Sequence, residues 1–144
     1  MRPNPREEMA LLVRDLEEVA GSDETSDAIS GDLRQCIRTL RRIERSLEQM
    51  VPYLRADNER LAGFLNQLRS GNEATLDAGD LALLGSTPPP LTGNWQEDVT
   101  EANTRNESLR DLLGRVVRAG GCSSRQARAD SRGVLMESIR SRPW

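Results

Sequence analysis

The sequence predicts an all-α protein: an elongated helical hairpin or a coiled-coil-like bundle of three to four helices, with a marginal C-terminal helix or tail. Two observations lead to this prediction. Leucine recurs every seven residues over one long stretch. The composition is rich in helix formers, with 36% hydrophobic, 30% charged and only 3% aromatic residues. A composition with so few aromatic and so many charged residues suits long helices, which need only an apolar stripe, better than a globule with a large core.

The strongest pattern lies between residues 30 and 70. Six leucines spaced seven apart fill the d positions of a heptad repeat: Leu33, Leu40, Leu47, Leu54, Leu61 and Leu68. The a positions hold Ile37, Glu44, Val51, Asn58 and Leu65, a pattern that favours two-stranded coiled coils. The g positions carry Cys36, Ile43, Met50 and Phe64, so the apolar face is wide enough for a bundle helix.

Pro52 lies inside this pattern and should disturb the helix, because proline removes one backbone hydrogen bond. The heptad phase nevertheless continues past it. We therefore expect one helix over 30–70, kinked at Pro52. The alternative is two helices, 30–50 and 52–70.

Two further helices are expected, over 5–20 and 94–119. Asn4 with Glu7, and Asn94 with Glu97, have the spacing of a capping box. The apolar stripe of the first helix consists of Met9, Leu12, Val13, Leu16 and Val19. That of the later helix consists of Trp95, Val99, Ala102, Asn106, Leu109, Leu113 and Val116.

The remaining segments are connectors and a tail. Residues 75–84 form a short helix or a turn. Residues 85–93 contain three consecutive prolines and predict a semi-rigid connector. We expect residues 1–119 to form a single helical domain, with the first helix packed before Pro52 and the 94–119 helix mainly after it. Residues 120–144 form a basic tail or a weak helix.

Asn58 and Asn106 both fall at a positions, each inside an Asn-Glu-x-Leu sequence. If residues 71–93 close a hairpin, the two asparagines lie about equally far from its tip and meet within about one helical turn. A buried asparagine pair fixes register at a cost in stability. The other reading is that Asn-Glu-x-Leu is simply a common helix composition.

Charge is distributed unevenly. Residues 1–32 hold three arginines against nine acids, whereas residues 121–144 hold five arginines against two acids. This acidic head and basic tail can attract each other within one chain or between chains. A cluster of arginines at the start of the long helix would face the acids of the first helix: Arg34, Arg38, Arg41, Arg42 and Arg45.

Several classes of function are poorly supported. The chain has no histidine, and all 20 basic residues are arginine, so the usual general base and Schiff-base or P-loop lysines are missing. Cys36 and Cys122 lie far apart without metal-type spacing, and reduced thiols are expected. We expect no enzyme activity and no catalytic, cofactor or metal site.

Membrane and nucleic-acid partners are also disfavoured. No segment approaches the ~20 apolar residues of a membrane span, and no secretory signal is visible, so a soluble cytoplasmic protein is expected. A nucleic-acid accessory protein that binds through the arginine-rich tail is only the second alternative, because acids outnumber arginines and no aromatics are interleaved in the tail.

We therefore expect a helical protein–protein interaction module, adaptor or chaperone-like, that binds a partner helix through an apolar helix face or the C-terminal tail. In size, helical layout and tail the chain resembles flagellar export chaperones of the filament-junction type. This generic likeness includes the stretch from Trp95 to Leu113, where Asn103 and Asn106 precede leucines. The alternative is a structural scaffold in which the heptads form a homodimer or a larger coiled coil.

The expected interaction face combines the two long stripes. It consists of Leu33, Ile37, Leu40, Ile43, Leu47, Met50, Val51, Leu54, Asn58, Leu61, Phe64, Leu65, Leu68, Trp95, Val99, Asn106, Leu109 and Leu113.

Overall fold

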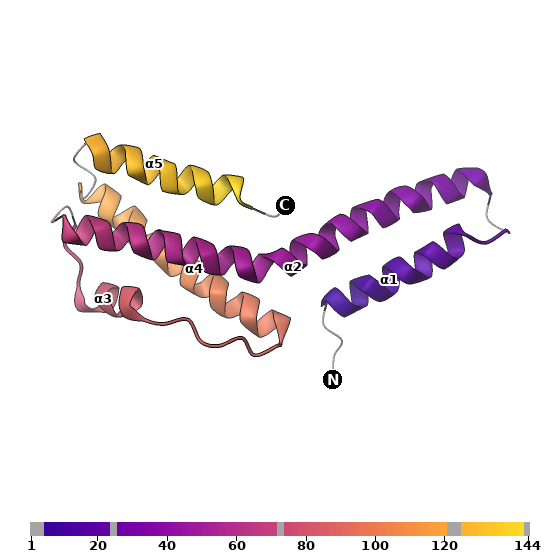
Figure 1. Ribbon diagram of the computed structural model, residues 1–144, viewed down its shortest axis with the longest axis horizontal. Helices are drawn as coiled ribbons and strands as arrows, with labels where there is room; N and C mark the ends of the chain where they lie inside the picture. Colours follow the sequence, from indigo (N-terminus) through magenta and orange to yellow (C-terminus); the bar gives the residue numbers. More distant parts are fainter. Residues whose placement is uncertain (1–4, 24–25, 72–73, 121–124, 143–144) are drawn as a thin grey trace. The chain divides into compact units, whose positions relative to one another are not determined.

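The computed structural model describes residues 5–23, 26–71, 74–120 and 125–142 (Figure 1). Within these ranges the chain forms five helices and no strand, which confirms the all-α prediction. The helices are α1 (Pro5–Ala20), α2 (Asp27–Ser70), α3 (Ala78–Gly85), α4 (Trp95–Arg118) and α5 (Arg125–Arg140). They divide into two compact units, one up to Met50 and one over Val51–Arg142.

In the first unit, α1 packs antiparallel on the first half of α2. Val13 and Ile37 are buried. The hydroxyl of Ser30, near the start of α2, donates to the carbonyl of Ala20, the last residue of α1, at 2.9 Å. The bounds of α1 match the predicted helix over 5–20, whereas its expected cap Asn4 lies outside the described residues.

Ion pairs set the orientation of these two helices. Arg41 pairs with Glu17, as the opposed charges of the sequence predicted. In a second pair the arginine is on α1 and the acid on α2: Arg6 contacts Glu48 at 2.6 Å. All four side chains are largely exposed, so each pair contributes little stability and mainly favours one register.

Helix α2 runs through Pro52 without interruption, so the prediction of one continuous helix is confirmed and the two-helix alternative is wrong. Its heptad leucines become more deeply buried along the chain. Leu33, Leu40 and Leu47 are half-buried, whereas the three after Met50 are buried: Leu54, Leu61 and Leu68. Cys36 is an exposed free thiol, and Cys122 lies outside the described residues.

The second unit is a bundle in which α2 and α4 run in the same direction (Figure 1). Asn58 of α2 contacts Ala102 and Asn106 of α4, and further along both helices Leu68 and Val116 share one core. The hairpin expected from residues 71–93 is therefore wrong. The connection instead returns along the bundle before α4 starts, so that Arg55 donates to the carbonyl of Pro89 at 2.7 Å. Helix α5 runs opposite to both (Figure 1).

The length of the connection explains this arrangement. A tight helical hairpin needs only about 2–5 residues. The connection from Ser70 to Trp95 is far longer and contains α3 and the triple-proline segment. An extended proline-rich chain advances by about 3.1 Å per residue. The connection can therefore span the ~30 Å length of a 20-residue helix and bring α4 back to the level of Pro52.

The core of this bundle lies between α2, α4 and α5. Its buried members are Leu61, Phe64, Leu65, Leu68, Leu109, Leu112, Leu113, Val116 and Ala127. Leu83 and Leu84 of α3 pack against it from the side. α3 begins with a capping box, in which the Asp77 carboxylate accepts from the backbone of Asp80 at 2.8 Å and the reverse bond is 3.3 Å.

The start of α4 is fixed by a small polar cluster. Asn94 caps the helix, and its side-chain oxygen Oδ1 accepts from the backbone N–H groups of Gln96 and Glu97. The reciprocal bond of the predicted capping box does not form, because the Asn94 N–H donates to Thr92 Oγ1 and Glu97 accepts from the Asn94 side chain instead. Asp98 completes the cluster by accepting from the N–H of Thr92 at 2.9 Å and from its hydroxyl at 3.0 Å.

These hydrogen bonds, first of all the one from the Thr92 N–H, lower the pKa of Asp98 below its usual value of 3.8. A carboxylate with a lowered pKa in the folded state stabilises the fold above its unfolded pKa and loses this contribution as the pH falls through the folded pKa.

We predict that Asp98→Asn is less stable than the wild type at neutral pH and that the difference shrinks as the pH falls below about 4 and through the lowered pKa of Asp98. Urea unfolding across this pH range measures it. Asp111→Asn, at an exposed position of the same helix, controls for the general effect of removing an acid. A difference for Asp98→Asn that stays constant with pH contradicts the assignment.

Candidate interaction site

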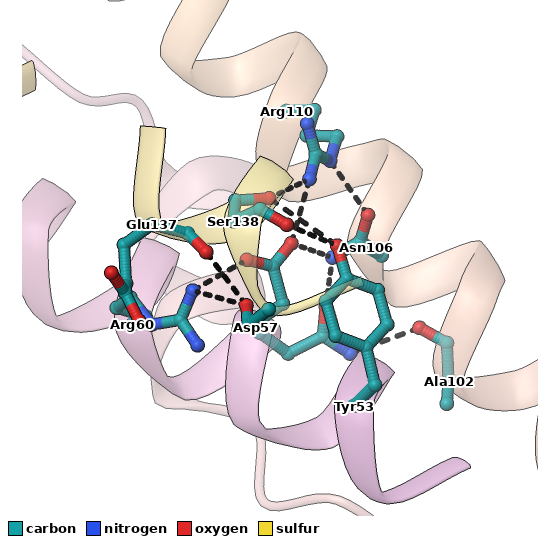
Figure 2. A network of polar contacts seen from close by, with 10 residues as sticks. Tyr53, Asp57, Arg60, Ala102, Asn106, Arg110, Glu137 and Ser138 are labelled. Atoms are coloured by element: carbon teal, nitrogen blue, oxygen red, sulfur yellow. Dashed lines mark hydrogen bonds and ion pairs between the residues drawn. The ribbon is translucent and has the colours of Figure 1, made fainter. Parts of the chain in front are cut away.

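The helices of the second unit meet at a buried carboxylate, Asp57 of α2 (Figure 2). One of its oxygens accepts from Asn106 Nδ2 at 2.8 Å and from Arg110 Nη2 at 2.7 Å, both on α4. The other oxygen accepts from Arg60 Nη1 at 3.3 Å. Removing a carboxylate from water is costly unless it is paired and hydrogen-bonded. These donors compensate that cost only when α2 and α4 are in this register.

The asparagine pair predicted from the sequence is formed. Asn106 Nδ2 donates to Asn58 Oδ1 at 2.9 Å, and Asn58 Nδ2 donates to the carbonyl of Ala102 at 2.9 Å. Both side chains are buried. The asparagines meet because the two helices are parallel and a positions face a positions, rather than because they lie equally far from a hairpin tip.

The same network holds α5 (Figure 2). The hydroxyl of Tyr53 donates to the carbonyl of Ser138 at 2.8 Å, and Arg110 donates to the Ser138 hydroxyl. Ser138 is completely buried. Arg60 reaches Ser141, just after α5, at 3.5 Å. Both arginines that pair with Asp57 therefore also contact the C-terminal segment.

Apolar contacts of α5 with the bundle are few by comparison. Ala127 is buried in the core, and Val134 is partly buried against it. Ser131 and Ser138 complete the inward face, so it consists of small and polar side chains. Since burial of large apolar side chains supplies most packing energy, α5 depends on its hydrogen bonds to a greater degree than α2 or α4.

The large apolar residues of α5 are not part of its buried face. Leu135, Met136 and Ile139 are exposed by 39%, 47% and 56%. Arg128, Arg132 and Arg140 are exposed beside them. We call these six residues the outer face of α5. The part of the chain that the structure describes holds no cluster of three or more metal-ligating side chains.

The structure buries most of the predicted interaction face in the interiors of the two units. The buried members are Ile37, Val51, Leu54, Asn58, Leu61, Phe64, Leu65, Leu68, Asn106, Leu109 and Leu113. Those that are half-buried are Leu33, Leu40, Leu47, Met50, Trp95 and Val99, and Ile43 is exposed. From Val51 onward, the α2 stripe is therefore the core of the fold. That any of these residues contacts a partner stays a prediction.

Sequence reasoning missed the centre of the network. Asp57 occupies the g position between Met50 and Phe64, in a row of otherwise apolar or small residues. A single carboxylate inside an apolar row is a signal for a buried, paired charge. Tyr53 and Ser138 were also missed, and Ser138 gave no signal in the sequence because serine is common on helix surfaces.

Comparisons with known proteins give no relative for this chain. No protein-family model, no curated protein and no solved structure matches it.

We predict that Asp57→Ala destabilises the protein by about 2–4 kcal/mol, because it removes the carboxylate that accepts from both the buried Asn106 amide and the partly exposed Arg110 guanidinium. Urea unfolding followed by circular dichroism measures the change. Asp111→Ala, at an exposed position, should shift stability by no more than about 0.5 kcal/mol. Equal effects of both substitutions would show that the network does not hold the bundle.

We also predict that Tyr53→Phe loosens α5 selectively. The loss of the bond to Ser138 costs about 1 kcal/mol, so amide protection along α5 should fall about five-fold while the central turns of α2 and α4 keep theirs. Hydrogen exchange read by NMR or mass spectrometry gives this pattern. Ser131→Ala, which removes a hydroxyl bond made within α5, is the matched control. A uniform loss across all helices contradicts the prediction.

Proposed function

We propose that this chain is a non-enzymatic helical module, adaptor or chaperone-like, that binds another protein through the outer face of α5. The observation that carries the proposal is the burial pattern of α5, which is the reverse of that expected for an amphipathic helix. Mainly small and polar side chains face inward, whereas Leu135, Met136 and Ile139 are exposed together. Adjacent exposed apolar side chains with polar flanks are typical of protein-binding surfaces.

The chemistry of this face suits a partner helix. Leu135 and Ile139 are four residues apart and lie on one side of α5, which is the spacing that an amphipathic helix contacts. Arginine side chains beside them can cover apolar surface with their methylene groups and pair with carboxylates by their guanidinium groups. We propose a cytoplasmic setting for this interaction, which suits two cysteines without metal-type spacing.

A scaffold built by pairing the leucine heptads of two chains is less well supported. Leu54, Leu61 and Leu68 are already buried in the chain's own bundle, so pairing through them requires that bundle to open. Among the described helices, none combines the length and the apolar character that crossing a membrane requires.

Site-specific photo-crosslinking tests the proposal. A photoreactive amino acid at Ile139 should give a discrete protein adduct in cells, because its side chain lies in the binding face. The same amino acid at Asp130, exposed on the opposite flank of α5, is the matched control and should give none. Leu135→Arg should abolish the Ile139 adduct. Absence of any adduct, or the same adducts at both positions, overturns the proposal.

A further inference from the structure

Two exposed stripes in this chain have the same spacing and opposite charge. On α5, Arg128, Arg132, Leu135 and Ile139 are exposed at positions i, i+4, i+7 and i+11. This spacing places them in one row along the helix. The row combines two cations with two apolar side chains.

Helix α1 carries the acidic counterpart. Glu8, Leu12, Asp15 and Val19 are exposed at the same i, i+4, i+7 and i+11 spacing. Leu12 and Val19 are exposed by 48% and 51%. The sequence predicts both, together with Val13, in the packing stripe of the first helix, but of these three the structure buries only Val13.

Each stripe is of one sign. At 100° per residue, the acids of α5, Asp130 and Glu137, lie on the side of the helix away from its arginine row. On α1, Arg6 pairs with Glu48 and Arg14 contacts its neighbour Asp15 at 3.3 Å in a solvent-exposed pair. The arginine row of α5 thus favours a partner helix that is acidic as well as apolar.

We propose that the partner of the outer face of α5 is helix α1 of a second copy of this chain. This inference rests on the proposed function and names the occupant of the same face. In an antiparallel pairing, Leu12 lies against Leu135 and Asp15 lies beside Arg132, and this orientation also aligns the helix dipoles favourably. Two such contacts, related by a two-fold axis, close a dimer.

The charges select this crosswise pairing over the two alternatives. In the same antiparallel arrangement, pairing α1 with α1 would place Asp15 opposite Leu12, and pairing α5 with α5 would place Arg132 opposite Leu135. Neither arrangement gives a charge an opposite partner, and two stripes of one sign repel each other, which disfavours both. The other side of α1 is already occupied within its own chain, where Val13 is buried.

A charge-swap experiment on the full chain tests this pairing. Light scattering on a sizing column, over a range of concentrations, should show a dimer for the wild type that dissociates more readily at high salt. Asp15→Arg alone, or Arg132→Asp alone, should raise the dissociation constant about tenfold or more, because each places like charges at both contacts. Circular dichroism verifies that the helices of both variants are intact.

The decisive sample is the equimolar mixture of the two variants. Pairing one Asp15→Arg chain with one Arg132→Asp chain restores an opposite-charge pair at both contacts, so the mixture should dimerise like the wild type. As a matched control, Asp111→Arg, at an exposed position, should leave the oligomer mass measured by light scattering unchanged. A wild type that is monomeric at every soluble concentration overturns the inference, as does a mixture of folded variants that fails to dimerise.

The two experiments together distinguish a failure of this inference from a failure of the proposed function. A monomeric wild type that still gives an adduct to a different protein at Ile139 overturns the second copy as partner and leaves the binding face in place. Both proposals are supported if the crosslink at Ile139 gives an adduct with twice the mass of the chain and the mixture of charge-swap variants dimerises. A monomer without adducts overturns both.

Discussion

A carboxylate without solvent contact, Asp57, receives hydrogen bonds from two helices, and the arrangement of the second unit follows from this requirement. Heptad periodicity alone does not define one register, since a slip of seven residues again places d positions opposite d positions. Such a slip would move Asn106 and Arg110 away from Asp57 and leave a buried charge unpaired, which is strongly unfavourable. The polar network therefore selects one alignment, and the leucines stabilise it.

The same requirement selects the direction of α4. In an antiparallel pair, a positions face d positions, so Asn58 would lie against an apolar d residue of α4 rather than against Asn106. Only the parallel arrangement satisfies both amides, and the long connection through α3 and the prolines permits it. The cost of the extra chain is modest, because the entropy of loop closure grows slowly with loop length.

Local features of the fold could be predicted from the sequence, because they depend on local chemistry. The bounds of α1, the end of α4 before Gly120 and the continuity of α2 follow from caps, glycines and unbroken heptad phase. Helix direction could not be predicted in this way, since apolar periodicity is the same for parallel and antiparallel neighbours. Asp57 was missed because a heptad pattern is judged by its apolar members, and a polar residue in a minor row does not break it.

Helix α5 docks through residues that apolar periodicity does not identify. The sequence predicts only a basic tail or a weak helix over 120–144, and in α5 the buried residues are Ala127 and Ser138 rather than the large apolar ones. A helix can dock through small side chains and hydrogen bonds if its neighbours supply donors, as Tyr53 and Arg110 do. Docking in this way leaves Leu135 and Ile139 on the surface of a helix whose position is fixed. A prepositioned apolar face loses less conformational entropy on binding than a flexible tail, which is the physical basis for assigning the interaction to this helix.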